Sequence, residues 1–505
     1  MSGRVLLINP TITSRRSARF PLAVLSLASV LEERGYSTDI IDGNIDRGFV
    51  STTRELIAQC RFDAVGVTVM GGPQVPSAMA VSKAIRQVAP QVPIVWGGYF
   101  PTLCPIPAAA APFVDYAVRG QGEETLHEIL QAHRAGGAGL ESIDGLSFRR
   151  GETLIHTRDR PFSAARLARP LPYHRLDDPG QYLGHTYLGR RTAGYQAAFG
   201  CRFRCTFCGV ATMFKGRTAL PAARRLDEDL RWLTRELGMD SIQFYDHNFF
   251  DREEDTLPLL EVLADHRLPW WCFARSDALA NLSTEAWALV RRSGLRMAYI
   301  GAESPNDRLL HDIRKGTRSD QTLQAVEVCR RNGVIPELSF MLAPPQDPEG
   351  ETERTFRFIR EVKRIHPATE VMLYVYTPLP PSGHDLDKQH PKKLRNAAAL
   401  RDVHGRPVEF PRSVEQWAEP EWVRYWCHLD APWLTDRLRR RIRDFTTVLG
   451  CRFPTIMDVR SPRFARRALR LLSAWRYRFE RYDRPWELRL SRQLVKLHDP
   501  RAVSL

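Results

Sequence analysis

Three cysteines in one short stretch are the residues of this chain best suited to do chemistry. Cys201, Cys205 and Cys208 fall within GCRFRCTFCGV (200–210), although the whole 505-residue chain has only nine cysteines. A structural zinc site usually closes with four protein ligands, and this stretch supplies three. Iron–sulfur clusters are held by cysteine thiolates, and a cubic cluster with three protein ligands keeps one iron open. The spacing therefore favours an iron–sulfur cluster over a zinc knuckle or three buried thiols.

The cysteines follow the first strand of a β/α series that runs from residue 193 to about residue 384. Six strand-like segments alternate with helical patterns in this region. They are GYQAAF (194–199), SIQFYD (241–246), WWCFAR (270–275), RMAYIGAE (296–303), PELSFML (336–342) and EVMLYVYT (370–377). Six units are too few to close an eight-stranded barrel, so we expect a partial (β/α)6 barrel with functional residues at the carboxyl ends of its strands.

A second alternation of strands and helices occupies residues 4–130 and predicts an α/β domain with a doubly wound parallel sheet. Such sheets bind ligands at the carboxyl ends of their strands, and glycines there let the backbone approach a ligand closely. The strand ends are NPT (9–11), MGGP (70–73), WGGYFPT (96–102) and RGQGEE (119–124). These glycines could instead serve only tight turns between strand and helix.

Four regions follow from these patterns. We expect a sheet domain over residues 1–135, a linker over 136–190, the barrel over 191–384 and a basic helical region over 385–505. The net charge is +15, and the last 75 residues hold 19 Lys and Arg against 7 Asp and Glu, a net +12. Because the excess charge lies in the tail, we expect no nucleic-acid partner.

Targeting signals are not evident in the sequence. The chain starts with the strand-like run MSGRVLLINP, and no apolar run approaches the ~20 residues that span a bilayer. We therefore expect a cytoplasmic protein, in a reducing compartment where clustered cysteines indicate metal or redox chemistry more than disulfides.

The cysteine stretch resembles that of the radical S-adenosylmethionine enzymes in its spacing, its place after the first barrel strand, and the aromatic Phe207 before the last cysteine. The resemblance implies a [4Fe–4S] cluster held by the three cysteines. It also implies that the open iron binds the methionine part of S-adenosylmethionine, whose reductive cleavage yields a 5′-deoxyadenosyl radical.

Later strand ends resemble further motifs of that family. These are FYDHNFFD (244–251), WCFARSDAL (271–279), IGAESPNDRLLHDIRKG (300–316), FMLAPPQDPEGET (340–352) and YVYTPLPPSG (374–383). With Phe207, they imply Asp246, Arg275 and Glu303 as S-adenosylmethionine-binding residues. Carboxylates can hold the amine and ribose hydroxyls of the ligand, and an arginine can hold its carboxylate. The fifth motif is usually Gly-Pro-Gly, but Ala343 and Pro345 replace the glycines here.

The first domain resembles that of the cobalamin-binding radical S-adenosylmethionine family, through PLAVLSLASVLEERGY, VWGGYFPT and VDYAVRGQGEET. The resemblance covers about residues 4–384 and implies cobalamin at the strand ends. The implied binding residues are Asn9, Pro10, Met70, Gly71, Gly97, Gly98, Pro101, Thr102, Gly120, Gly122 and Glu123. No histidine occurs before His127, so we expect no protein histidine on the cobalt.

The implied function is methylation of an unactivated carbon by the 5′-deoxyadenosyl radical and methylcobalamin, with a small-molecule or lipid-like substrate and an external one-electron reductant. No catalytic base is assigned. A competing function is that of a ring-forming enzyme of the anaerobic magnesium-protoporphyrin ester cyclase type. A cobalamin or iron–sulfur sensor or carrier without catalysis also fits the motifs. A nucleic-acid modifier would fit the net charge, but the confinement of that charge to the tail disfavours it.

The segment 461–485 has the pattern of a basic amphipathic helix. On a helical wheel, Phe464, Ala468, Leu471, Leu472, Trp475 and Phe479 form one stripe, and arginines lie opposite. Such a helix can lie on an anionic membrane, which predicts peripheral contact with the inner membrane face. The stripe could instead pack on the barrel and leave the arginines in solvent.

Overall fold

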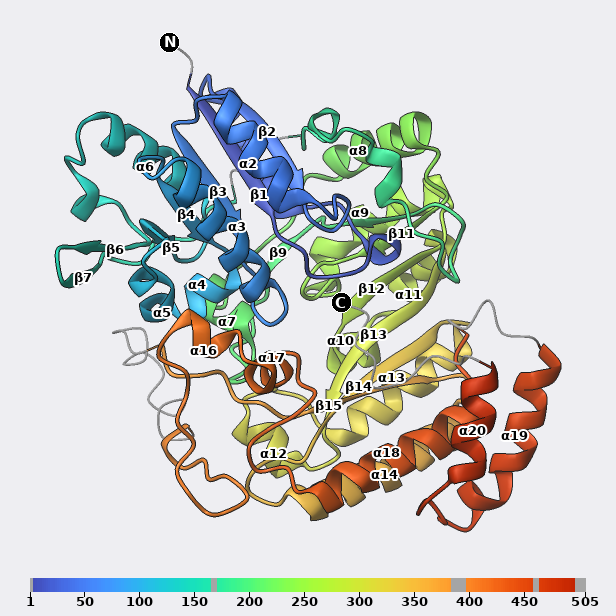
Figure 1. The fold of residues 1–505 in the computed structure, drawn as a ribbon. Helices are drawn as coiled ribbons and strands as arrows, with labels where there is room; N and C mark the ends of the chain where they lie inside the picture. Colours follow the sequence, from blue (N-terminus) through green and yellow to red (C-terminus); the bar gives the residue numbers. More distant parts are fainter. Residues whose placement is uncertain (1–2, 165–169, 383–396, 457–462, 496–505) are drawn as a thin grey trace.

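The computed structural model describes residues 3–164, 170–382, 397–456 and 463–495, and its main elements are two sheets with their helices (Figure 1). The first sheet has the strand order β2-β1-β3-β4-β5-β6-β7. Its parallel strands are β1 (Arg4–Asn9), β2 (Ser37–Asp42), β3 (Ala64–Thr68), β4 (Ile94–Gly97) and β5 (Tyr116–Val118). The run VLLI within β1 is fully buried, as expected for a parallel strand covered on both faces.

Helices cover both faces of this sheet. α1 (Leu22–Glu33) and α6 (Glu123–Arg134) pack together over one face, and α2 (Phe49–Gln59) and α3 (Gln74–Val88) pack over the other. Two short helices, α4 (Tyr99–Leu103) and α5 (Pro105–Ala110), follow β4. The predicted doubly wound sheet is confirmed, and its glycine-rich strand ends share one edge.

A hairpin that the sequence placed in the linker extends the first sheet. β6 (Leu146–Arg150) pairs antiparallel with β5 and with β7 (Thr153–His156). Leu146 and Phe148 on β6 are buried in the same core as α1 and α6. This hairpin therefore covers the edge of β5, and the first domain of the structure reaches beyond residue 135.

The second sheet is parallel throughout and open, with the order β15-β14-β13-β12-β11-β8. Its strands are β8 (Thr192–Tyr195), β11 (Ser241–Phe244), β12 (Trp270–Ala274), β13 (Leu295–Glu303), β14 (Ile335–Leu342) and β15 (Glu370–Val375). The helices between them include α8 (Ala223–Leu237), α9 (Glu253–His266), α11 (Thr284–Ser293), α13 (Ser319–Arg331) and α14 (Pro348–Ile365). The predicted six-unit partial barrel is confirmed.

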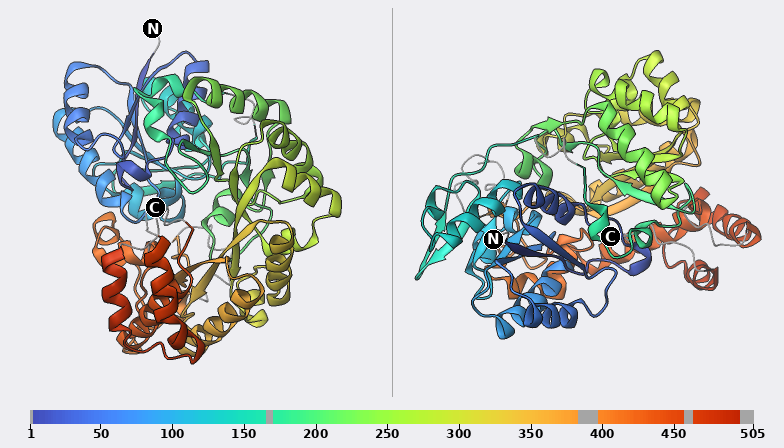
Figure 2. Two further views of the ribbon diagram at one scale, coloured as in Figure 1. Left: turned by 90° about the vertical axis from the view of Figure 1, so that its right-hand side faces the viewer. Right: turned by 90° about the horizontal axis from the view of Figure 1, so that it is seen from above.

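The C-terminal region joins the two domains. α16 (Val414–Trp417) and α17 (Pro420–Trp426) place Trp417 and Trp426 against Phe100 of the first domain. α18 (Asp436–Arg452) lies along α14, where the rings of Phe356 and Phe445 stack with centroids 3.7 Å apart. Two further views show these helices against both domains (Figure 2).

The last two described helices are α19 (Arg463–Arg478) and α20 (Trp486–Val495), which pack on α18 and on each other. Among the helices that the structure describes, none has both the length and the apolar character needed to cross a membrane.

Candidate active site

A short hairpin fixes the start of the cysteine loop. β9 (Phe199–Gly200) pairs with β10 (Thr218–Ala219), and α7 (Gly209–Phe214) follows the last cysteine. Gly200 has a φ of +81°, and a Cβ built there would lie 2.0 Å from the carbonyl oxygen of Arg217. Only glycine fits this position, because the contact is with backbone and the left-handed region disfavours a side chain.

The three cysteines form no disulfide bond, and they lie close enough to change one another's pKa. Burial raises the pKa of Cys208 to about 11, and the neighbouring Cys205 thiol contributes to the rise. Burial also raises the pKa of Cys201. Cys201 and Cys208 stay partly accessible, so they line a space rather than a sealed core.

The donor set fits an iron–sulfur cluster. Three soft thiolate donors come from one loop, and thiolates are the ligands that such clusters use. In the described residues, no group of three or more His, Cys, Asp or Glu side chains converges enough to hold a metal ion directly. We therefore keep Cys201, Cys205 and Cys208 as the proposed cluster ligands on the basis of their type and spacing.

One imidazole connects the cysteine loop to the first domain. The backbone N–H of Gly200 donates to Nδ1 of His247 at 3.1 Å, so that nitrogen carries no proton. A neutral imidazole then has its proton on Nε2, which lies 3.1 Å from the hydroxyl of Tyr99 and donates to it. Tyr99 follows the Gly97-Gly98 turn directly and also lies beside Gly209 at the other end of the loop.

Two ion pairs lie beside the cysteines. Arg275 binds Asp277 through two bonds of 2.9 and 3.1 Å, and its guanidinium carbon lies 3.4 Å from the centre of the Phe203 ring. Glu303 has a φ of +61° and accepts from Nζ of Lys315 at 2.7 Å. Arg275 also donates to the carbonyl of Lys315, so the two pairs form one buried network. The structure thus brings the predicted residues Arg275 and Glu303 together.

Asp246 and Phe207 occupy more enclosed positions. Asp246 is fully buried, and its carboxylate accepts the backbone N–H groups of Ala197 (3.1 Å) and Ala198. Burial raises the pKa of this carboxyl to about 7. It holds the chain between β8 and β9, so its carboxylate faces that backbone rather than the space beside the cysteines. Phe207 packs against an apolar cluster that includes Leu310.

The fifth-strand turn keeps its shape without glycine. Ala343 has a φ of +54°, which glycine would adopt more easily. Its N–H donates to Oγ1 of Thr352 at 3.1 Å, and its carbonyl accepts from Nε1 of Trp433 at 2.9 Å. The C-terminal region therefore supplies a bond that holds this unusual turn.

Part of the predicted cobalamin-binding edge is tied together by a residue that the sequence reasoning missed. Gln74 donates to Oδ1 of Asn9 (3.0 Å) and to the carbonyl of Pro10 (2.7 Å), and accepts from the N–H of Met70 (2.6 Å). Its signal in the sequence was a glutamine directly after MGGP at the start of a helix. Met70 remains 47% exposed and available to a ligand.

The other candidate residues of this edge divide into accessible and enclosed ones. Gly97, Gly98, Gly120 and Gly122 are partly accessible; Pro101, Thr102, Glu123 and Gly71 are buried. Thr102 donates to the carbonyl of Gly98 and accepts from the N–H of Gly120. Glu123 accepts from the hydroxyl of Ser26 at 2.8 Å. The buried polar residues thus shape the edge, and the glycines leave room beside it.

The C-terminal region also closes over this edge. A Cβ on Gly71 would lie 2.0 Å from the ring of Trp426, so that glycine makes room for the indole. A cavity of about 750 Å³ opens nearby, lined by residues that include Thr11, Ser77, Cys427 and Leu429. Backbone groups and space of this kind suit a large ligand such as cobalamin, and the described residues before His127 place no histidine there.

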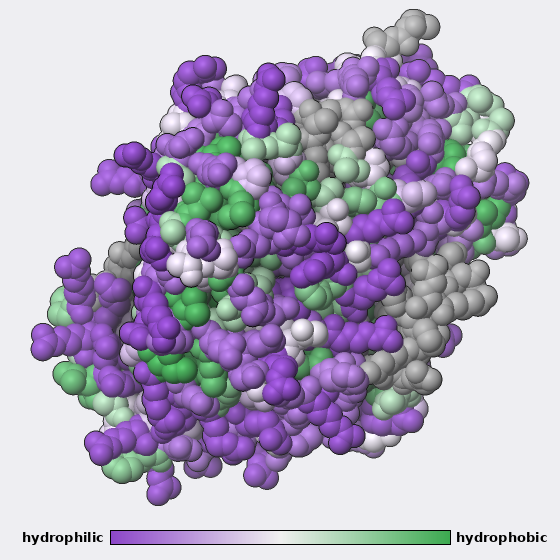
Figure 3. Space-filling model, turned by 180° about the vertical axis from the view of Figure 1, so that it is seen from behind, coloured by the Kyte–Doolittle hydropathy of each residue, from purple (hydrophilic) through white to green (hydrophobic). Residues whose placement is uncertain are grey.

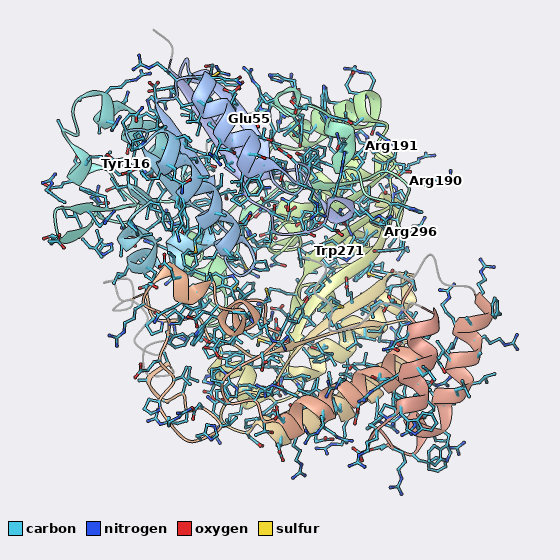
Figure 4. The ribbon with its side chains drawn as sticks, in the orientation of Figure 1. Glu55, Tyr116, Arg190, Arg191, Trp271 and Arg296 are labelled. Carbon is cyan, nitrogen blue, oxygen red and sulfur yellow. The ribbon has the colours of Figure 1, made fainter. Side chains whose placement is uncertain are left out.

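Aromatic rings form one wall inside the barrel. Fully buried residues such as Ile242 and Phe244 face the helices, so their alternating neighbours face the interior. The rings on that side are those of Tyr245, Trp271, Phe273, Tyr299 and Tyr374. Trp271 lies in the middle of the molecule (Figure 4). The wall suits an apolar or aromatic molecule.

Two charged or polar groups interrupt this wall. Glu337 is buried and accepts from Nε1 of Trp271 at 2.9 Å; burial raises the pKa of its carboxyl to about 7. Arg19, from the loop after β1, donates to the hydroxyl of Tyr245 at 3.1 Å. It passes over Gly194 on the edge strand β8, where a Cβ would meet the Tyr245 ring at 2.6 Å.

A third polar group, His428, lies at the end of β15. Its carbonyl accepts from the N–H of Val375 at 2.8 Å, and Nδ1 bonds the hydroxyl of Thr377. Its φ is +56°, an uncommon backbone conformation for a non-glycine residue. Burial lowers the pKa of the imidazole to about 4, so it is neutral at pH 7. Sequence reasoning missed both Arg19 and His428, since each reaches the barrel from another region.

Comparison with known proteins defines the class. The family model described as B12 binding domain matches residues 9–130, and the model described as Radical SAM superfamily matches residues 195–359. Together they cover more than half of the chain. The chain therefore belongs to the cobalamin-binding radical S-adenosylmethionine enzymes, and its cofactors are a [4Fe–4S] cluster, S-adenosylmethionine and cobalamin.

Two curated relatives match about two thirds of the chain. An uncharacterized methyltransferase of Pyrococcus horikoshii is 26% identical over 345 residues, which are 68% of this chain and 73% of that protein. The anaerobic magnesium-protoporphyrin IX monomethyl ester cyclase of Synechocystis is 24% identical over 348 residues, 66% of this chain and 67% of that protein.

Two solved structures share the fold. The radical S-adenosylmethionine methyltransferase TsrM of Kitasatospora setae, with cobalamin and a [4Fe–4S] cluster bound, has a TM-score of 0.64 and 19% identity, covering 83% of this chain and 84% of that one. The cobalamin-dependent S-adenosylmethionine radical enzyme OxsB has a TM-score of 0.58 and 17% identity, covering 78% and 55%.

The start of the cysteine loop can be tested with two glycines of similar φ. Gly200→Ala places a Cβ against a carbonyl oxygen, whereas Gly35→Ala (φ +84°) meets nothing within 4 Å. The Gly35 variant should lose only about 1 kcal/mol of stability from backbone strain. The Gly200 variant should also displace the loop, so its iron content after anaerobic reconstitution should fall well below that of Gly35→Ala. Full iron loading of Gly200→Ala would contradict this account of the loop.

The imidazole bridge predicts different effects for two substitutions at one position. An asparagine amide oxygen can replace Nδ1 as the acceptor for Gly200 N–H, but alanine cannot. His247→Asn should therefore retain its cluster in a chelator challenge much longer than His247→Ala does. Equal cluster lifetimes in the two variants would show that the Gly200–His247 bond does not hold the loop.

The raised pKa of Glu337 predicts a pH-dependent stability. The carboxyl keeps its proton in the folded protein up to about pH 7 but loses it near the ordinary value of 4.5 when unfolded. Folding then binds a proton in this window, so the carboxyl contributes less stability as pH rises through it. The melting temperature of Glu337→Gln relative to the original protein should therefore rise between about pH 5 and about pH 8.

Glu327→Gln is the matched control for that measurement. Glu327 is half-buried at the surface of α13, and hydrogen bonds from Arg330 and Arg331 lower its pKa to about 2. The effect of Glu327→Gln on the melting temperature should not change between about pH 5 and about pH 8, because the Glu327 carboxyl is ionised in both the folded and the unfolded protein in that range. A pH-independent effect of Glu337→Gln would contradict the raised pKa.

Proposed function

We propose that this enzyme is a cobalamin-dependent radical S-adenosylmethionine methyltransferase that methylates an unactivated carbon. The observation that carries the proposal is the contact between the two halves of the site. Tyr99, at the glycine-rich edge of the first domain, is hydrogen-bonded to His247. His247 in turn accepts a hydrogen bond from the N–H of Gly200, the residue directly before Cys201. Ligands of the two domains would therefore share one space.

When bound, the cofactors would supply the bond-breaking chemistry: the cluster would provide the electron for reductive cleavage of S-adenosylmethionine, and cobalamin would provide the methyl group. The chain supplies orientation. Cys201, Cys205 and Cys208 would hold the cluster, and Phe207, Asp246, Arg275 and Glu303 belong to the proposed S-adenosylmethionine site. Arg275 and Glu303 would shape that site as members of the ion-pair network. Asp246 would shape it indirectly, by binding the backbone between β8 and β9.

The candidate residues of the first domain would hold cobalamin in the same way. The glycines leave backbone groups accessible, and Asn9, Thr102 and Glu123 fix the turns that present them. An external one-electron reductant would deliver the electron that the cluster needs.

The barrel wall supports a small-molecule or lipid-like substrate. Five aromatic rings offer an apolar surface, and Arg19 and His428 offer polar groups at its borders. Rings stabilise apolar and conjugated molecules by contact area and by edge or face geometry. Nucleic acid is not among the proposed partners of the enzyme.

Similarity to named proteins supports methyl transfer and leaves one competing reaction. TsrM is a methyltransferase, and the Pyrococcus relative is named as one. The relative named as an anaerobic cyclase supports ring formation as the second candidate. Methylation adds one CH2 to the mass of the product, whereas ring closure removes hydrogen.

The cytoplasm is the location that fits the proposal. Residues 461–485 are the part of the chain proposed to meet the inner membrane face, and residues 461 and 462 of this segment lie outside the described residues.

The proposed radical chemistry requires the cysteine loop. Cys205→Ala should abolish formation of 5′-deoxyadenosine from S-adenosylmethionine under anaerobic reduction, because the cluster loses one of three ligands. Cys60→Ala is the matched control, since Cys60 is partly exposed at the end of α2 and outside the site. Equal 5′-deoxyadenosine formation by the two variants would refute the assignment of the cluster.

A further inference from the structure

The surface of the protein carries one concentration of large exposed apolar side chains. In the described residues, ten large hydrophobic side chains are exposed, and seven belong to α19, α20 or the turn directly after α19. They are Phe464, Leu471, Leu472, Trp475, Phe479, Trp486 and Leu490. Phe464 is 79% exposed and Trp486 is 70% exposed. We call these seven residues the apolar stripe.

The stripe faces outward even though α19 is packed on the protein. The helix contacts α18 through its opposite edge, where Leu469 and Ser473 are buried. On α20, Leu488 is buried, whereas Trp486 and Leu490 point away from the core. The structure therefore does not show the packing of this stripe on the barrel that the sequence left open. Large apolar patches on a surface usually mark a binding face.

The location of these helices leaves the stripe accessible. α19 and α20 lie at the edge of the molecule, remote from the first domain (Figure 1). From behind, this end of the protein shows apolar residues interspersed with strongly hydrophilic ones at the lower left (Figure 3). The patch therefore mixes apolar and charged groups, as an interfacial helix does.

The charged groups around the stripe are mostly positive. Residues 463–490 include nine arginines and three acidic residues. All three acidic side chains already pair with arginines: Glu487 with Arg476, Glu480 with Arg360, and Asp483 with Arg441.

Three other arginines of this surface are exposed. Arg463, Arg467 and Arg478 have no ion pair to a described residue. They flank the apolar stripe and are free to bind an anionic partner.

We propose that the apolar stripe and its arginines dock the enzyme on an anionic lipid bilayer. The apolar rings would enter the interface between headgroups and acyl chains, and the arginines would meet lipid phosphates. Tryptophan and phenylalanine suit this position because their apolar bodies can be buried there. The surface includes α20, which lies beyond the segment 461–485 identified from the sequence.

Charge favours a bilayer over a second copy of the chain. Two identical surfaces with nine arginines each would repel when brought face to face. An anionic bilayer is complementary over the whole face and accepts a convex helix without a matching groove. The docking does not depend on the proposed methyl transfer; it would only bring a lipid-like substrate closer to the barrel, since α19 packs on α18 and α18 stacks on the barrel helix α14.

Vesicle binding tests the proposal with the full-length protein. The probes are vesicles of phosphatidylcholine alone and vesicles of phosphatidylcholine with phosphatidylglycerol, and the readout is cosedimentation. Binding should be at least about tenfold stronger with phosphatidylglycerol and should weaken as salt is added. The double variant Trp475→Ser/Phe479→Ser should bind at least about tenfold more weakly, because it loses two rings of the stripe.

Two further variants separate the contribution of the arginines from that of the apolar stripe. Arg463→Gln/Arg467→Gln/Arg478→Gln should lose the preference for phosphatidylglycerol. Val88→Ser/Val403→Ser changes exposed apolar residues elsewhere, which are 39% and 47% exposed, and should bind as the original protein does. Unchanged melting temperature and iron content would show that each variant is folded.

Several results would overturn the proposal. They are equal binding by the stripe variant and the valine control, equal binding to both kinds of vesicle, and a dimer that the stripe variant abolishes without any vesicle binding. None of these depends on formation of 5′-deoxyadenosine, so failure of the docking proposal is distinguishable from failure of the proposed function.

Discussion

The hydrogen bonds on the two nitrogens of His247 join the parts of the molecule that the chemistry needs. One nitrogen accepts from the backbone directly before the cysteines, and the other donates to Tyr99 at the edge of the first domain. Each bond determines the proton position required by the other, so the imidazole holds the cysteine loop and the first domain in one arrangement. Radical chemistry depends on such alignment, because the reacting atoms must be close and correctly oriented.

Buried charges beside the cysteines are arranged in pairs. Arg275 pairs with Asp277 and also donates to the carbonyl of Lys315, and Nζ of Lys315 pairs with Glu303. Removing one member of such a pair leaves an uncompensated charge and typically costs about 3–5 kcal/mol. The pairs are therefore a rigid frame for a charged ligand. The C-terminal region adds to that frame by binding Ala343 through Trp433 and by covering Gly71 with Trp426.

Local patterns in the sequence were enough to predict both sheets and the cysteine loop, because strand and helix periodicities and the cysteine spacing lie within short stretches. They were not enough for features that depend on distant contacts. The β6–β7 hairpin joins the first sheet through pairing with β5. The carboxylate of Asp246 faces backbone amides rather than the space beside the cysteines, which only the folded loop reveals. Arg19 and His428 approach the barrel from other regions of the chain. The direction of the apolar stripe depends on which edge of α19 meets α18, and helical periodicity alone does not decide that.

The central claim is that one enzyme uses its iron–sulfur cluster to cleave S-adenosylmethionine and its cobalamin to accept the methyl group of S-adenosylmethionine. The most direct measurement is anaerobic reconstitution with iron, sulfide and cobalamin, followed by reduction and quantification of 5′-deoxyadenosine and S-adenosylhomocysteine. The account predicts both products, with S-adenosylhomocysteine formed only when cobalamin is present, because the methyl group needs an acceptor. Formation of 5′-deoxyadenosine alone, whether or not cobalamin is bound, would contradict methyl transfer, and formation of neither product would contradict catalysis by this protein.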